Sequence, residues 1–74
     1  MVIGEKILLL RRKNKISQNE LAEWIGCRQT NISNWELGLF EPSLYYLIKL
    51  ADFFNVSLDE LCCRDFKKGE MSNE

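Results

Sequence analysis

The sequence predicts an all-α domain of five short helices. Apolar residues recur three and four positions apart in successive segments, which is the spacing of the buried face of an α-helix. Residues that favour helix ends separate these segments. The chain has 74 residues, of which 46% are apolar, so we expect one small hydrophobic core rather than extensive disorder.

The first helix is expected from Ile3 to about Lys13. Asn14 is expected to end it, because asparagine tolerates the left-handed backbone conformation found at helix ends. The apolar stripe of this helix consists of Ile3, Ile7 and Leu10.

A second helix is expected after Ser17, whose hydroxyl can cap it while Glu20 completes a capping box. Gly26 allows a sharp turn at the end of this helix. The residues expected to face the core are Leu21, Ala22 and Ile25.

The third helix, at about residues 28–36 and ending at Gly38, carries the most informative pattern. Ile32 and Trp35 lie one turn apart and are expected to point into the core. The opposite face has no acid and no large apolar side chain, and short hydrogen-bonding groups of this kind suit the reading of base edges in DNA. These outward residues are Thr30, Ser33 and Asn34, flanked by Gln29.

The fourth helix is expected to follow Pro42, with Ser43 as its cap and Asn55 at its end. Its apolar residues recur three or four positions apart and are expected to be buried. They are Leu44, Leu47, Leu50, Ala51 and Phe54.

Ser57 is expected to cap a short fifth helix, with Asp59 and Glu60 placed favourably in its first turn. We therefore expect the domain to span residues 3–62 and residues 63–74 to form a polar, flexible tail. The apolar residues of this helix expected in the core are Leu58 and Leu61.

Composition argues against an enzyme, a metal site and a membrane protein. The chain has no histidine, no Cys-x-x-Cys pair and no glycine-rich phosphate loop, so no catalytic centre, zinc site or cofactor is expected. No apolar run approaches the ~20 residues of a membrane span, and no signal peptide is apparent, so we expect a cytoplasmic protein. Cys27, Cys62 and Cys63 form no obvious disulfide framework; the adjacent pair is expected to pack at the end of the core, with an inter-subunit disulfide as the alternative.

Charge is distributed unevenly, although the net charge is only −1. Residues 1–40 hold six basic and four acidic side chains, whereas residues 41–74 hold four basic and seven acidic ones. The positive excess therefore accompanies the third helix, which favours a nucleic-acid partner.

Several motifs occur together in the order of a known family. The segments are Ser17-Gln18-x-Glu20-Leu21-Ala22, Ile32-Ser33-x-Trp35-Glu36-x-Gly38, Pro42-Ser43-Leu44 and Val56-Ser57-Leu58-Asp59-Glu60-Leu61. With them, the chain from about Ile3 to Leu61 resembles the Cro/lambda-repressor-type helix-turn-helix domains, also called xenobiotic-response-element regulators. The resemblance implies a lambda-repressor-like fold in which the second and third helices form the helix-turn-helix and the third lies in the major groove of DNA.

The resemblance also assigns roles to individual residues. It implies base contacts from Gln29, Thr30 and Asn34, with Ser33 beside them. Gln18 matches a glutamine that binds a phosphate and braces the recognition helix, and Lys15 and Arg12 are further candidates for phosphate binding. Arg11 and Glu36 match an ion pair between the first and third helices. An ordinary solvated surface position is the alternative for Arg11 and for Gln29, Thr30 and Asn34.

Two departures from the family pattern stand out. Arg28 occupies the position of the usual Ser or Thr cap, and we hypothesise that it contacts a phosphate or a guanine edge instead; a simply lost cap or a shifted turn is the alternative. Leu39-Phe40-Glu41 replaces a loop that commonly carries Lys or Arg, and Leu37 replaces a polar residue. We therefore expect weak binding by a monomer, with a shallow salt dependence.

Apolar side chains are also expected on the surface. Residues expected to point outward are Leu8 or Leu9, Trp24, Leu39, Phe40, Tyr45, Tyr46 and Phe53. Scattered exposed apolar residues are normal, but Leu39, Phe40, Tyr45 and Tyr46 are close in sequence and could form a contiguous interface. We expect this surface to pair two copies of the chain, with a different protein as the other possible partner.

The sequence thus predicts a sequence-specific regulator of transcription, of repressor type, that binds double-stranded operator DNA as a homodimer. No small-molecule effector can be inferred. The alternative is a protein–protein interaction module that keeps the fold and has lost most DNA binding. RNA is a weaker candidate because the chain lacks an evident aromatic stacking platform for single strands.

Overall fold

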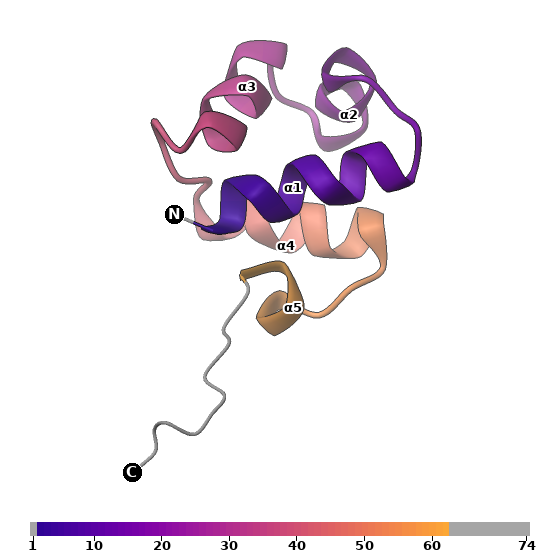
Figure 1. The fold of residues 1–74 in the computed structure, drawn as a ribbon, viewed down its shortest axis with the longest axis vertical. Helices are drawn as coiled ribbons and strands as arrows, with labels where there is room; N and C mark the ends of the chain where they lie inside the picture. The colour runs from indigo at the N-terminus through magenta and orange to yellow at the C-terminus, as the bar shows by residue number, and fades with distance from the viewer. Residues whose placement is uncertain (1, 63–74) are drawn as a thin grey trace, which may run out of the picture.

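The computed structural model describes residues 2–62, which form five α-helices and no strand (Figure 1). The expected tail, residues 63–74, lies outside the described residues. The helices are α1 (Val2–Lys13), α2 (Gln18–Ile25), α3 (Gln29–Leu37), α4 (Leu44–Phe54) and α5 (Leu58–Cys62).

Helix α1 runs through the middle of the domain. It packs against α3 on one side and α5 on the other, while α2 contacts α3 and α4 (Figure 1). The side chains buried between these helices are Ile3, Ile7, Leu10, Leu21, Ala22, Ile25, Ile32, Trp35, Leu50, Ala51, Phe54 and Leu61. Nearly all core positions expected from the helical spacing are therefore confirmed, and the described helices share one core.

The end of α1 differs from the expectation in one detail. Asn14 does not adopt the left-handed conformation; Lys15 does, with φ 58°. The Asn14 side-chain amide donates to the Leu10 carbonyl at 2.7 Å, and the chain reverses one residue later, where Ile16 N–H donates to the Arg11 carbonyl at 3.2 Å. This 6→1 bond is the pattern of a Schellman motif, which places the left-handed residue after the helix cap.

The helix-turn-helix is built as expected. The Ser17 hydroxyl accepts from the Glu20 N–H at 3.0 Å, and the Glu20 carboxylate accepts from the Ser17 N–H at 2.8 Å, so the capping box is confirmed. Gly26 has φ 86° and ends α2 in a conformation that costs glycine no strain. Gly38 ends α3 in the same way, with φ 78°.

A glycine in α1 determines how closely α1 and α3 approach. A Cβ atom added at Gly4 would lie 2.2 Å from the Trp35 carbonyl oxygen and 2.8 Å from that of Glu36. Both contacts are to backbone, which cannot rotate away. Gly4 therefore lets the first turn of α1 pack directly on the last turn of α3, and the sequence pattern did not predict this role.

Two expected core residues are exposed instead. Leu44 is 64% exposed and Leu58 is 39% exposed. Each is the first residue of its helix, and side chains lean toward the helix amino terminus, so these two project past the end of the helix rather than onto its neighbours.

The two serines before these helices also differ from each other. Ser43 occupies the cap position of α4 but makes no side-chain capping bond. In contrast, the Ser57 hydroxyl accepts from the Glu60 N–H at 3.0 Å, as expected. Asn55 ends α4 in the left-handed conformation, with φ 57°.

Candidate nucleic-acid interface

Helix α3 starts without a side-chain cap from Arg28, which has extended backbone angles and occupies the cap position. The Asn31 side-chain oxygen accepts from the Arg28 N–H at 3.3 Å. One half of a capping box is thus supplied from inside the helix, a role for Asn31 that sequence reasoning missed. The sequence contained a signal for this bond, because a short amide side chain three residues after the cap position can accept from the cap residue's N–H.

The inner and outer faces of α3 separate as the helical period predicts. Ile32 is fully buried and Trp35 is 3% exposed. Thr30 is exposed on the opposite side, and Ser33 and Asn34 are half-exposed. The described part of α3 thus presents short donors and acceptors to solvent and keeps its two largest side chains in the core.

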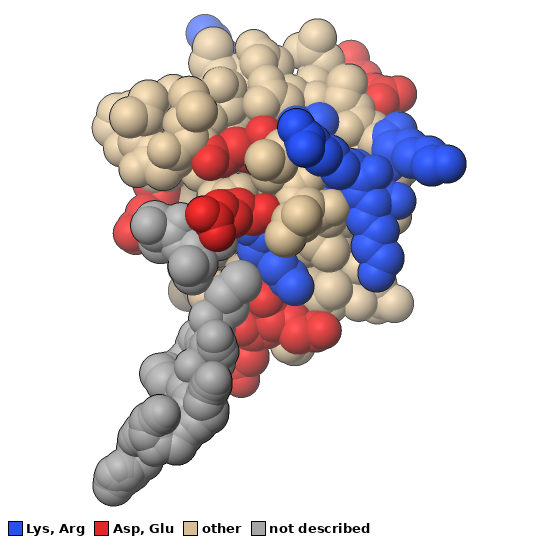
Figure 2. Space-filling model, viewed as in Figure 1, with Lys and Arg blue, Asp and Glu red and all other residues tan. Residues whose placement is uncertain are grey.

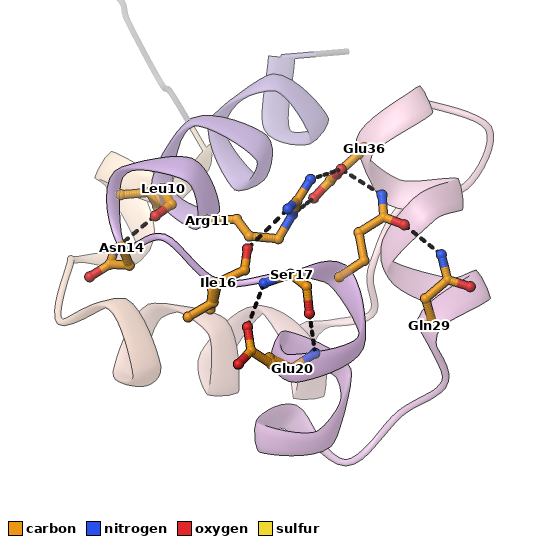
Figure 3. Close-up of polar contacts among 9 residues, drawn as sticks. Leu10, Arg11, Asn14, Ile16, Ser17, Glu20, Gln29 and Glu36 are labelled. Carbon is orange, nitrogen blue, oxygen red and sulfur yellow. Dashed lines mark hydrogen bonds and ion pairs between the residues drawn. The ribbon is translucent and has the colours of Figure 1, made fainter.

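A chain of polar contacts links α1, α2 and α3 (Figure 3). Arg11 makes a two-pronged ion pair with Glu36: its Nε lies 2.7 Å from one carboxylate oxygen and its Nη2 lies 3.1 Å from the other. Gln18 Nε2 donates to the same Glu36 carboxylate at 2.9 Å, and Gln29 Nε2 donates to Gln18 Oε1. The ion pair between the first and third helices, implied by the family resemblance, is therefore present.

The ion pair is largely shielded from water. The side chains of Arg11 and Glu36 are 14% and 5% exposed, and hydrogen bonding to Glu36 raises the pKa of the Arg11 guanidinium above its ordinary value. Arg11 Nη1 also donates to the Ile16 carbonyl at 3.0 Å. The pair thus fixes α3 to both the end of α1 and the turn that follows it.

This network fixes the orientation of two amides. Because Gln18 donates to the Glu36 carboxylate, its oxygen must face Gln29. Gln29 then uses one N–H inside the protein and keeps its Oε1 and its second N–H for a ligand. Since Gln18 and Gln29 are the first residues of α2 and α3, the two helix amino termini are joined at the point where they meet.

Positive side chains lie beside this network rather than on α3. Helix α3 itself contains no Lys or Arg between Gln29 and Leu37. Figure 2 shows Lys and Arg gathered over the carboxyl-terminal end of α1 and the turn to α2. The exposed basic residues of that segment are Arg12, Lys13 and Lys15.

Comparison with known proteins identifies the family. The family model described as helix-turn-helix matches residues 7–61. The chain belongs to the Cro/repressor-type helix-turn-helix family. This family comprises DNA-binding regulators rather than enzymes, in agreement with the composition.

Solved structures similar to this helix-turn-helix chain are repressor DNA-binding domains. The P22 c2 repressor in complex with a synthetic operator matches with a TM-score of 0.78 and 34% identity, over 82% of this chain and 92% of that one. The N-terminal DNA-binding domain of SinR from Bacillus subtilis matches with a TM-score of 0.78 and 32% identity, over 92% and 97% of the two chains. The expected lambda-repressor-like fold is confirmed.

Curated relatives of the helix-turn-helix chain are named as transcriptional regulators. BcrR of Enterococcus faecalis, a transcriptional activator, is 38% identical over 82% of this chain and 30% of its own length. ImmR of Bacillus subtilis, a transcriptional regulator, is 34% identical over 88% and 51%. RstR, a CTXphi phage repressor of Vibrio cholerae, is 34% identical over 86% and 57%. The chain therefore spans between about a third and three-fifths of these relatives.

More apolar side chains of the helix-turn-helix chain are exposed between residues 37 and 48 than the four expected, and one of those four, Tyr46, is not exposed. Tyr46 is half-buried, with its ring centroid 5.4 Å from that of Trp35, so it supports the core rather than the surface. Phe53, also expected outside, is half-buried beside Trp24 and Phe54. We define the apolar surface by the large side chains exposed between residues 37 and 48, namely Leu37, Leu39, Phe40, Leu44, Tyr45 and Ile48.

The remaining candidate groups from the sequence are the cysteines, possible metal ligands and possible membrane-spanning helices. Cys27 and Cys62 are half-buried free thiols packed against the core, and desolvation raises the pKa of Cys27; Cys63 lies outside the described residues. No group of three potential metal ligands occurs in residues 2–62. None of the described helices is long and apolar enough to cross a membrane.

Proposed function

We propose that this chain is a sequence-specific regulator of transcription that places α3 in the major groove of double-stranded operator DNA. The observation that carries the proposal is the network that holds Gln29 at the start of α3 through Gln18, Glu36 and Arg11. A side chain held in this way loses little conformational entropy when it binds a base edge. The similar P22 c2 repressor is in complex with a synthetic operator, which supports operator DNA as the ligand.

Base recognition falls to the exposed amino-terminal part of α3. Gln29 and Asn34 carry amides that can make paired hydrogen bonds to adenine, and Thr30 offers both a hydroxyl and a methyl group. Arg28 is exposed at the helix start and reaches a guanine edge or a phosphate. The proposed base-reading residues are Arg28, Gln29, Thr30, Ser33 and Asn34.

Phosphate binding falls to the residues around the start of α2. Arg12 and Lys15 are exposed beside it. Gln18 stands at the amino terminus of α2, where unpaired backbone N–H groups favour an anion. These contacts set the position of α3 but contribute no sequence preference.

The active form is a homodimer of repressor type in the cytoplasm, paired through Leu39, Phe40 and Tyr45 with support from Tyr46. The first three side chains are 62–65% exposed. Two-fold pairing would present two recognition helices to half-sites about one helical turn apart. It would also compensate for the few phosphate contacts of each copy.

The test is a fluorescence-anisotropy titration at low salt. The probes are duplexes from the region upstream of the protein's own gene and a scrambled duplex of the same composition. We expect tighter binding to one genomic duplex, and we expect Asn34→Ala to abolish that preference. Asn19→Ala, at an exposed position on α2, is the matched control and should leave it intact. Equal binding to all duplexes would refute sequence-specific recognition.

The second candidate is a protein–protein interaction module on the same fold. It is supported by the apolar surface and by Glu41, an acid in the loop after α3. The same titration separates the two functions. Absence of measurable DNA binding at low salt, together with a stable complex through the apolar surface, would favour the interaction module.

A further inference from the structure

A cleft of about 330 Å³ lies between α3 and the start of α4. Its volume is at the small end of the range of ligand sites. The proposed function assigns no ligand to this cleft, although it uses Asn34, Phe40 and Tyr46 for contacts with DNA or a second copy. Its lining residues are Asn31, Asn34, Trp35, Phe40, Glu41, Ser43 and Tyr46.

Three aromatic residues line this cleft, Trp35 from α3, Tyr46 from α4 and Phe40 from the loop between them. Trp35 is buried and packs with its ring centroid 5.4 Å from that of Tyr46, whereas Phe40 is exposed. The row continues through Tyr45, which is 5.1 Å from Tyr46 and already has the Lys49 ammonium 5.4 Å from its ring centroid. Aromatic faces attract cations, and the contact between Lys49 and Tyr45 within α4 is an example next to Tyr46.

The polar groups of the cleft also favour a positively charged ligand. Glu41 is its single ionisable lining residue other than Tyr46. Within residues 2–62, the Glu41 carboxylate makes no ion pair or hydrogen bond, and the Ser43 hydroxyl makes no capping bond. A carboxylate in a cleft that aromatic residues also line, with a spare hydroxyl, is a binding environment for a small organic cation rather than for an anion.

We propose that the cleft between α3 and α4 binds a small organic monocation of the alkylammonium class. The cation contacts the rings of Tyr46 and Phe40 and is neutralised by Glu41. Asn31 and Asn34 lie on the α3 side of the cleft, so the bound cation touches the same helix that we propose to read DNA.

The experiment titrates ¹⁵N-labelled full-length protein with tetramethylammonium at constant ionic strength and follows amide and indole NMR signals. A neutral compound of similar shape, tert-butyl alcohol, is the parallel probe. We expect saturable shifts centred on the lining residues with tetramethylammonium, and at least about fivefold weaker binding of the alcohol. Shifts spread over the whole domain, or equal binding of both probes, would overturn the proposal.

Two exposed positions allow substitutions that should not unfold the protein. Glu41→Gln should weaken tetramethylammonium binding by about threefold to fivefold, the upper range for an exposed charge pair. Phe40→Leu, which removes the ring and keeps the apolar character, should also weaken it by about threefold. Glu23→Gln, an exposed acid on α2 outside the cleft, is the control. Unchanged affinity in Glu41→Gln would overturn the assignment.

The cleft shares Phe40 and Tyr46 with the proposed dimer surface. A comparison of cation binding by the dimer and by the monomer therefore rests on the proposed function. At protein concentrations where sedimentation shows a dimer, tetramethylammonium should bind more weakly than to the monomer. If the protein sediments as a monomer throughout and the cation still binds, the dimer proposal fails and the cation site stands.

Discussion

At the scale of single residues, Arg28 combines a local cost with a proposed function. It places a cation at the positive end of α3 and contributes no side-chain cap. The Asn31 side chain recovers part of the lost capping through its bond to the Arg28 N–H. A residue that violates a helix-start preference at a proposed binding face is a candidate for functional selection.

Arg28→Ser should therefore have opposite effects on the stability of the fold and on DNA affinity. The new hydroxyl can cap α3, and we expect the free energy of unfolding to rise by about 1 kcal/mol. DNA affinity should fall by about 1 kcal/mol or more, since a guanine or phosphate contact is lost. Urea denaturation and anisotropy measure the two effects. Arg28→Ala, which removes the cation without adding a cap, should weaken binding with no gain in stability; unchanged affinity in both variants would contradict the role.

Gly4, in contrast to Arg28, contributes to the packing of the fold and has no proposed role in binding. In an exposed helix, Gly→Ala would stabilise by about 1 kcal/mol. Here the added Cβ would lie 2.2 Å from the Trp35 carbonyl oxygen. We expect Gly4→Ala to destabilise the domain by about 1–3 kcal/mol, the usual cost of overpacking. Urea denaturation tests this, with Glu5→Ala on the exposed side of α1 as control; a more stable Gly4→Ala protein would refute the close contact.

At the scale of helices, the Arg11–Glu36 pair connects elements 25 residues apart in sequence. Arg11→Met would leave the Glu36 carboxylate, only 5% exposed, without its cation. We expect a loss of about 2–4 kcal/mol in the free energy of unfolding, toward the range for a broken buried pair.

The double variant Arg11→Met, Glu36→Gln should recover much of this loss, because it removes the uncompensated charge and keeps an oxygen that can accept from Gln18. A double-mutant cycle by urea denaturation measures the coupling. Additive effects of the two substitutions would show that the pair contributes nothing as a pair.

Helix periods and capping motifs predicted most of this architecture. The inward residues Ile32 and Trp35 and the capping box at Ser17 were predicted because each depends on residues close in sequence. Leu44 and Leu58 were misassigned because periodicity does not register that the first side chain of a helix leans past its end. The contact of Gly4 with the end of α3 depends on residues far apart in sequence, and no local pattern encodes it.

The sequence predicted the residues of the candidate site but not all of the contacts between them. The outward face of α3 followed from the helical period, and the family resemblance supplied Arg11, Glu36 and Gln18. The bond between Gln18 and Gln29 and the partial cap from Asn31 appeared only in the structure, because they require side-chain positions. Tyr46 was assigned to the surface, and the structure instead packs it on Trp35, since its aromatic ring can cover the core edge.

At the scale of the molecule, the apolar surface around Phe40 should determine the oligomeric state. Phe40→Lys places a charge in the proposed interface and should convert the dimer to a monomer in analytical ultracentrifugation without DNA. Leu9→Lys is the matched control, because Leu9 is 62% exposed on α1 and outside the apolar surface. If the mass of Phe40→Lys equals that of the unaltered protein, this surface does not pair two copies.

The charge distribution of the molecule determines the salt dependence of DNA binding. The loop after α3 carries Leu39, Phe40 and Glu41 and no basic residue. Each phosphate contact contributes about 0.9 to the slope of log affinity against log salt. We expect a shallow slope from anisotropy titrations over a range of salt concentrations. A slope corresponding to about six phosphates per monomer would contradict the prediction.

The separation of the two faces of α3 has an evolutionary consequence. Ile32 and Trp35 fix the helix from within, while Thr30, Ser33 and Asn34 take no part in the core. Exchanges among the outward residues can therefore change which operator is bound at little cost in stability. A duplicated copy of such a gene could acquire a new target through a few surface substitutions while its product continues to fold.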